Sequence, residues 1–160
     1  MLNIKIICVG KLKERFYSDA ASEYIKRLTG YCKPEIVEIS EHRLPENPTE
    51  SQIVIALEKE YNAVRACIPA GAFTVALCLE GQEMDSNGLS KLLSDCAGHG
   101  ESRLCFIIGG SYGLHYDLKA RTNMNLSLSQ MTFPHHLARV ILLEQLYRAF
   151  TIIEGGKYHK

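Results

Sequence analysis

The sequence has no excess of charge of either sign, because 18 Lys and Arg residues balance 18 Asp and Glu residues among its 160 residues. Net charge therefore argues neither for nor against a nucleic-acid partner. No apolar run approaches the roughly 18 residues that a membrane helix needs, so we expect no membrane-spanning segment. A cationic stretch followed by an apolar one is also missing at the N-terminus, and we expect residues 1–9 to form a strand rather than a targeting signal.

Several chemical signatures are absent as well. The sequence contains neither G-x-G-x-x-G nor the Walker pattern, which argues against ordinary dinucleotide binding and P-loop chemistry. It lacks the G-x-S-x-G of a nucleophilic serine. Its six histidines form neither H-E-x-x-H nor a Cys/His ligand set, so we expect no metal site. The six cysteines are scattered, and without a secretion signal we expect reduced thiols in the cytosol.

What is present is the composition of a folded domain, with 46% hydrophobic and 22% charged residues. These values exclude a disordered, collagen-like or low-complexity chain. The charges are unevenly placed: residues 1–33 carry seven basic and three acidic side chains, residues 111–160 carry six and three, and residues 34–110 carry five and twelve. A fold that brings the two ends together would present a basic face to an anionic partner, although ordinary solvated surfaces are the alternative.

Strand-like and helix-like patterns alternate along the chain. They predict a single α/β domain over residues 1–160, with a mainly parallel sheet flanked by helices. The expected strands are residues 4–9, 35–39, 73–79, 104–108 and 125–128, and the expected helices are residues 12–28, about 49–67, 86–97, 116–121 and 134–154, with Thr49 and Ser86 as N-caps. The last helix is apolar around most of its circumference, which is typical of burial on more than one side. We expect the second burying surface to be another copy of the chain, which predicts a homodimer.

Two segments beyond expected strand ends are candidate ligand sites, because ligands bind there in open α/β sheets. Residues 107–113, Ile-Ile-Gly-Gly-Ser-Tyr-Gly, can bring backbone close to a ligand, although a tight turn would explain two of the glycines. Residues 126–136 lead into the helix that Pro134 opens, and a plain β–α connection is the alternative. The tail, residues 155–160, combines Lys, Tyr and His and suits stacking on a base, although termini usually fray. Glu80 could place a carboxylate at a strand end, but a solvated loop is favoured.

Five segments together resemble the RlmH family of ribosomal RNA large subunit methyltransferases, within the SPOUT superfamily. They are Val9–Lys13, Phe106–Leu114, Leu128–His135, Glu144–Ala149 and Tyr158–Lys160. The resemblance spans essentially the whole chain. It implies a cytoplasmic homodimer that transfers a methyl group from S-adenosylmethionine to N3 of a pseudouridine in 23S rRNA of the assembled ribosome. It also implies a C-terminal trefoil knot around the cofactor site, which periodicity does not predict.

By similarity, the residues expected to contact the cofactor are Leu77, Gly109, Leu128, Ser129, Gln130, Met131, Thr132 and Phe133. A sulfonium methyl is already electrophilic, so the protein must align it with a nitrogen and manage one proton without a metal. The candidates are His159 for proton handling, Tyr158 for stacking, and Arg139 for the deprotonated base or a phosphate. Arg148 and His135 are further candidates.

Each of these arginines also has a purely structural alternative. Arg148 is equally suited to a structural pair with Glu144 at i, i+4, and Arg139 to a contact that stabilises the fold. Two other functions also stay open: a methyltransferase of the same fold that acts on tRNA or free rRNA, and a non-catalytic module that binds RNA or the ribosome. The sequence leaves open which group is the base and whether the tail acts in its own cavity or in a partner's.

Overall fold

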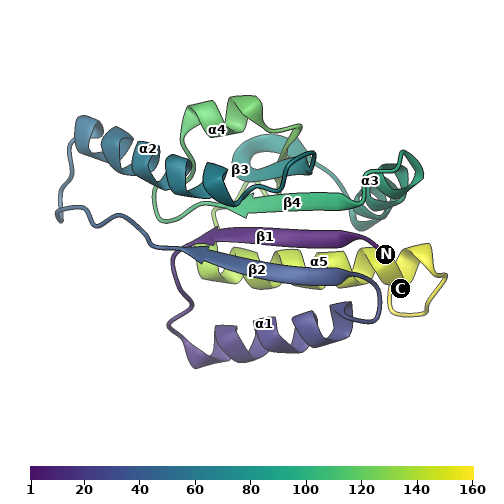
Figure 1. The fold of residues 1–160 in the computed structure, drawn as a ribbon. Coiled ribbons are helices and arrows are strands. Elements are labelled where there is room, and N and C mark those ends of the chain that lie inside the picture. Colours follow the sequence, from purple (N-terminus) through teal and green to yellow (C-terminus); the bar gives the residue numbers. More distant parts are fainter.

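A computed structural model describes residues 1–160 and shows a five-stranded, entirely parallel sheet in the order β2-β1-β4-β3-β5 (Figure 1). The strands are β1 (Asn3–Val9), β2 (Lys33–Ile39), β3 (Phe73–Glu83), β4 (Arg103–Ile108) and β5 (Met124–Ser127). The helices are α1 (Arg15–Leu28), α2 (Glu50–Cys67), α3 (Ser86–Gly98), α4 (Tyr116–Arg121) and α5 (His135–Ile153). The predicted α/β class and parallel sheet are confirmed.

The helices cover both faces of the sheet. Figure 1 shows α2 and α4 on one side and α1 and α5 on the other, and α3 packs against α5. Side chains alternate between the two faces along each strand. In β1, for example, Ile4 and Ile6 join the core beneath α1, α3 and α5, whereas Ile7 and Val9 join the smaller core beneath α2 and α4. The central strands are thus buried on both sides, as their continuous apolar runs predict.

Some element boundaries differ from the prediction. Helix α1 begins at Arg15 rather than residue 12, because the Leu12 amide donates to Glu38 Oε2 (3.2 Å) and is held in the preceding loop. Asp85, not Ser86, caps α3 by accepting from the Gly88 amide at 2.7 Å, which frees the Ser86 hydroxyl to contact α5. The predicted cap Thr49 is confirmed and forms a full capping box with Gln52.

Strand β3 is longer than predicted and irregular in the middle. Its Leu77 pairs with Leu126 of β5, and Gln82 pairs with the same residue again, so the segment between them leaves the ladder. Gly81 makes the return possible: a Cβ atom added there would lie 2.7 Å from the backbone carbon of Leu126. This irregularity turns residues 78–80 towards the carboxyl end of the sheet, where they line a cavity.

Helix α5 is buried on one side by its own chain. Leu142, Leu143, Leu146 and Ala149 have no exposed surface, and α1 and α3 both pack against the helix. Other apolar residues of α5 keep partial exposure, namely Leu137, Val140, Ile141 and Ile152, and Ile153 is 43% exposed, so the chain leaves part of the apolar circumference uncovered. The homodimer and the trefoil knot stay predictions. None of the five helices has both the length and the hydrophobicity needed to cross a bilayer.

Candidate active site

A cavity of about 830 Å³ opens at the carboxyl ends of β3, β4 and β5. Its wall combines the irregular part of β3, the glycine-rich segment 109–113, the segment 127–134 and the first turn of α5. Its volume lies within the range of roughly 300–1,000 Å³ that is typical of small-molecule and cofactor sites. Its place is the one where open α/β sheets bind ligands. The two segments predicted from sequence therefore meet in one site.

Seven of the eight residues predicted to contact the cofactor line this cavity: Leu77, Gly109, Leu128, Ser129, Met131, Thr132 and Phe133. Gln130 is exposed and does not line it. Local hydrogen bonds shape the segment: the Ser127 hydroxyl donates to the Ser129 carbonyl, and the Ser129 hydroxyl accepts from the Met131 amide, each at 3.0 Å. The contacts with the cofactor itself stay predictions.

The glycine-rich segment forms a tight turn whose backbone leaves no room for side chains at its start. The Gly113 amide donates to the Gly110 carbonyl (3.0 Å), and Gly113 has a φ of +78°. A Cβ atom added at Gly109 would lie only 2.4 Å from the Gly113 carbonyl oxygen. The glycine at position 109 is therefore a steric requirement of the cavity wall.

A second chain segment anchors this turn. The Ser111 amide donates to Glu41 Oε1 at 3.0 Å, although the two residues are 70 positions apart. Partial burial opposes ionisation of Glu41, but the Ser111 hydrogen bonds hold the pKa of its carboxyl below the ordinary value. Sequence reasoning missed Glu41, because nothing near it in the sequence marks a ligand site.

His135, the first residue of α5, lies in the cavity wall with its Nε2 atom buried and without a hydrogen-bond partner. Burial, together with the neighbouring His136, keeps the pKa of His135 below its ordinary value. The imidazole is therefore neutral at pH 7 and able to accept a proton.

An ion pair faces the same cavity from another side. Glu80, in the irregular part of β3, and Lys119 of α4 both line the cavity, and the Lys119 amine pairs with the Glu80 carboxylate. The Lys119 hydrogen bond holds the pKa of Glu80 below its ordinary value. The favoured interpretation of Glu80 as a residue of a plain solvated loop was incomplete, because the carboxylate belongs to the cavity wall. Lys119 was missed.

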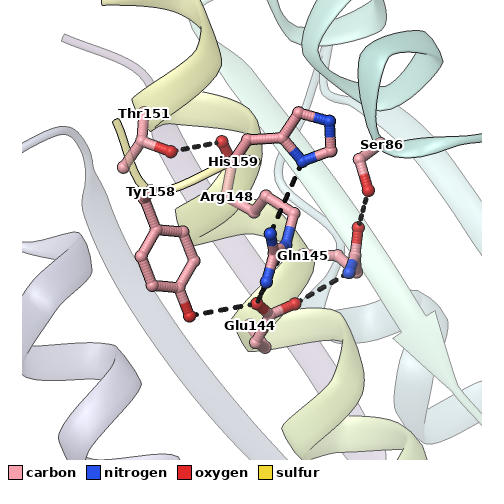
Figure 2. A network of polar contacts seen from close by, with 7 residues as sticks. All are labelled: Ser86, Glu144, Gln145, Arg148, Thr151, Tyr158 and His159. Carbon is pink, nitrogen blue, oxygen red and sulfur yellow. Dashed lines mark hydrogen bonds and ion pairs between the residues drawn. The ribbon is translucent and has the colours of Figure 1, made fainter. Parts of the chain in front are cut away.

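The C-terminal tail folds back onto α5 (Figure 2). On one oxygen of Glu144, Oε1, three donors converge: Arg148 Nη2 (2.5 Å), Arg148 Nε (3.0 Å) and the Tyr158 hydroxyl (3.2 Å). The Arg148 guanidinium lies 4.7 Å from the centre of the Tyr158 ring, and its Nη1 lies 3.5 Å from His159 Nδ1. We call these four residues the tail network. Burial, Tyr24 and Glu144 raise the pKa of Tyr158 to about 12, so its phenol stays protonated at neutral pH.

The tail network lies away from the cavity of its own chain. The part of α5 that lines the cavity ends at Ala138, and no residue of the network lines it. Glu144 and Arg148 lie six and ten residues further along α5, which places them roughly 9 and 15 Å from Ala138 along the helix axis. The structure brings Tyr158, His159 and Arg148 together, but not with the cavity.

Arg139 is buried and does not line the cavity; it joins α5 to the sheet. Its Nη1 donates to Glu38 Oε2 (2.9 Å) and its Nη2 to the Gly10 carbonyl (3.0 Å), and only 3% of the residue is exposed. This is the fold-stabilising contact named as the alternative. Its predicted catalytic role gains no support from this geometry.

Solved structures share this fold. A probable methylase family protein from Haemophilus influenzae is 12% identical with a TM-score of 0.59, over 99% of this chain and 71% of that one. A probable methyltransferase from Bordetella pertussis is 15% identical with a TM-score of 0.57, over 93% of this chain and 96% of that one. A family model described as predicted SPOUT methyltransferase matches residues 2–159. Fold and family model together define a SPOUT methyltransferase.

Relatives narrow the family further. The ribosomal RNA large subunit methyltransferase H of Clostridium botulinum is 47% identical over 99% of this chain and 100% of its own length. A protein of Methanococcus vannielii described as a putative ribosomal RNA large subunit methyltransferase H is 45% identical over the same shares. The chain thus belongs to the RlmH family of SPOUT methyltransferases, and the resemblance in the sequence is confirmed.

SPOUT methyltransferases use S-adenosylmethionine as the methyl donor, and the cavity fits such a group. When bound, this cofactor supplies an electrophilic methyl group on a sulfonium. The glycine-rich turn, whose start has no space for a Cβ atom, lets a ligand approach the backbone closely. Leu77, Ile108 and Leu128 offer an apolar interior, and Ser129 and Glu80 offer hydrogen-bond acceptors.

Proposed function

We propose that this methyltransferase modifies N3 of a pseudouridine in 23S rRNA of the assembled ribosome. The observation that carries the proposal is the similarity over 99% of the chain, at 47% and 45% identity, to relatives named as ribosomal RNA large subunit methyltransferases H. The charge distribution supports an RNA substrate. Helices α1 and α5, which come from the two ends with an excess of basic residues, pack against each other on one side of the sheet, whereas Lys119 and Arg121 lie on α4 on the other side (Figure 1).

The reaction requires that the base lose its N3 proton as the methyl group arrives. Two histidines could accept this proton, and they lie in different parts of the molecule. His135 lies in the cavity wall and is neutral at pH 7, while His159, the candidate from sequence, is on the exposed tail. Tyr158 stays protonated at neutral pH, so it can stack on the base or donate a hydrogen bond but cannot act as the base.

We infer that the protein works as a homodimer in which the tail of one protomer completes the cavity of the other. In a single chain the tail network and the cavity lie at different levels of α5, so the tail does not reach its own cavity. A two-fold arrangement would supply each cavity with one tail. His159 would then act on a base in the partner's cavity, with Tyr158 and Arg148 placing it.

The test is tritiated methyl transfer from S-adenosylmethionine to ribosomes from cells that lack this protein. Naked 23S rRNA and tRNA serve as parallel acceptors. We expect label on intact ribosomes alone, at N3 of a pseudouridine. Label on free rRNA or tRNA would keep the enzyme class and overturn the substrate. Absence of S-adenosylmethionine binding would instead favour a non-catalytic module that binds RNA.

A further inference from the structure

The mouth of the cavity is bordered by three apolar side chains that remain largely exposed. Leu79, Tyr112 and Met131 are 50%, 48% and 72% exposed, and all three line the cavity. They come from separate segments: the irregular part of β3, the glycine-rich turn and the segment before α5. Single exposed apolar residues are ordinary on protein surfaces. Three that surround one ligand cavity form an apolar rim, and we use this name for them.

Tyr112 is the aromatic member of the apolar rim, and hydrogen bonds on either side of it fix its backbone. It is the third residue of the turn closed by the Gly113 amide and the Gly110 carbonyl, and the preceding amide, of Ser111, is anchored to Glu41. A ring on such a fixed turn has only its two side-chain torsions left to order. The entropic cost of using it as a contact surface is therefore small.

The reaction at this cavity needs an aromatic contact of this kind. A pyrimidine nitrogen reaches a donor inside a cavity only after the base has left its stack, which costs stacking energy. Proteins recover that energy by stacking the base on aromatic side chains. Because the reacting nitrogen must come within about 3.5 Å of the methyl group inside the cavity, the rest of the base occupies the mouth, where the apolar rim lies.

We propose that the ring of Tyr112 stacks on the target base and holds it at the mouth of the cavity, with Leu79 and Met131 covering its edges. This inference rests on the proposed function. The ring is half exposed at the mouth, whereas the interior of the same cavity is formed by more deeply buried residues such as Ile108, which is 4% exposed. The interior suits the cofactor, and the apolar rim suits the base that must approach it from outside.

The chain offers a matched control in Tyr116. It is 67% exposed and lies four positions further on, at the start of α4, where its ring stacks on His115 and does not line the cavity. A change at Tyr116 removes a similar exposed ring from the same region without touching the mouth. Any general effect of losing an exposed tyrosine is therefore seen there as well.

The first experiment compares Tyr112→Ala, Tyr112→Phe and Tyr116→Ala in steady-state methylation of ribosomes. For Tyr112→Ala we expect kcat/KM to fall about 5- to 150-fold, the effect of one base–aromatic stack, mainly through a higher KM for ribosomes. Tyr112→Phe keeps the ring and should stay within about twofold of wild type, as should Tyr116→Ala. Affinity for S-adenosylhomocysteine, measured by calorimetry, should be unchanged in all three.

A second measurement uses the absence of tryptophan from this chain. Tyr112→Trp and Tyr116→Trp each give a protein with a single indole. We expect ribosomes to quench the indole at position 112 and not at 116, while S-adenosylhomocysteine alone quenches neither. Melting temperature checks that each variant is folded.

The outcomes separate this inference from the proposed function. Wild-type protein that does not methylate ribosomes overturns the proposed function and the inference with it. Active wild type with an equally active Tyr112→Ala variant overturns the inference alone. A Tyr112→Ala variant whose affinity for S-adenosylhomocysteine falls in parallel with kcat/KM would show that the ring contacts the cofactor instead, which also overturns it.

Discussion

The cavity wall and the tail network are built in opposite ways. The cavity wall is fixed by backbone: a hydrogen-bonded turn, a glycine whose Cβ atom would lie 2.4 Å from a carbonyl oxygen, and a segment that leaves and rejoins β3. The tail network is held by side chains that converge on the single carboxylate of Glu144. The first arrangement cannot change without refolding, whereas the second can be exchanged for other contacts.

The energies of the two regions differ accordingly. The Arg148–Glu144 pair is an i, i+4 pair with side chains 25% and 18% exposed, and such helix pairs contribute about 0.3–0.5 kcal/mol. That pair lies within α5, and the side chains of the tail are attached to it by one phenol hydrogen bond, the 3.5 Å contact of His159 with Arg148, and ring contacts. The tail network is therefore held by a few side-chain contacts, each of which contributes little to stability. The comparison teaches that binding of the cofactor and handling of the substrate can be broken separately.

The largest effect is expected at Gly109. Gly109→Ala places a Cβ atom against the backbone of Gly113, which no side-chain rotation relieves. We expect affinity for S-adenosylhomocysteine to fall more than about 100-fold, or about 3 kcal/mol, by calorimetry. The control is Gly98→Ala at the end of α3, where a Cβ atom meets nothing within 4 Å. Wild-type affinity in Gly109→Ala would mean that the turn is free to adjust.

The next effect separates the tail from the cavity. His159→Ala should lower kcat for ribosome methylation by at least about 100-fold, the usual contribution of a proton acceptor, and leave affinity for S-adenosylhomocysteine unchanged. Glu154→Gln, an exposed change before the tail, is the control. If kcat stays high in His159→Ala and collapses in His135→Gln, the proton acceptor belongs to the cavity wall.

Arg139 stabilises the fold, so its replacement should lower the free energy of unfolding. Arg139→Met leaves the Glu38 carboxylate and the Gly10 carbonyl without their buried partner. We expect the free energy of unfolding in urea to fall by about 2–3 kcal/mol, below the full cost of breaking a buried pair because Glu38 is one-third exposed. Arg148→Met, which breaks the weaker pair, should cost less than about 1 kcal/mol. Equal losses in the two variants would contradict the assignment.

The smallest effect is a dependence of stability on pH at His135. Its folded pKa is depressed by burial, so the unfolded chain binds a proton more readily than the folded chain does. Stability is therefore full above the ordinary pKa of about 6.5 and is lost as pH falls towards the folded value. His135→Gln should show a smaller loss of urea midpoint between pH 7.5 and 5.5 than wild type. His99→Gln, at an exposed position, should not differ from wild type.

Local patterns predicted most of the fold. All five strands and all five helices have counterparts in the sequence analysis, and the capping box at Thr49 and the glycine-rich turn follow from neighbouring residues. The irregularity in β3 could not be predicted from neighbouring residues, because it depends on how Gly81 packs against β5. The start of α1 was misplaced because a carboxylate of β2, from Glu38, holds Leu12 in the loop.

The sequence predicted the parts of the candidate site that consist of consecutive residues. It did not predict the residues that are distant in sequence and join the site only in the folded protein. Family resemblance and spacing located segments 109–113 and 128–133. Glu41 and Lys119 enter the site through long-range packing, and no local signal marks them. Residue type alone could not separate the roles of the two arginines, because Arg139 is buried in the fold and Arg148 lies in the tail network. Only their partners in three dimensions do so.

The most direct test of the account is complementation between two inactive variants. Gly109→Ala loses the cavity and keeps the tail, and His159→Ala loses the tail and keeps the cavity. If tails act across a two-fold dimer, subunits mixed by co-refolding form about half mixed dimers, each with one intact site, and ribosome methylation should return to about a quarter of the wild-type rate. A mixture as inactive as its two parents would contradict the claim that one protomer's tail completes the other's cavity.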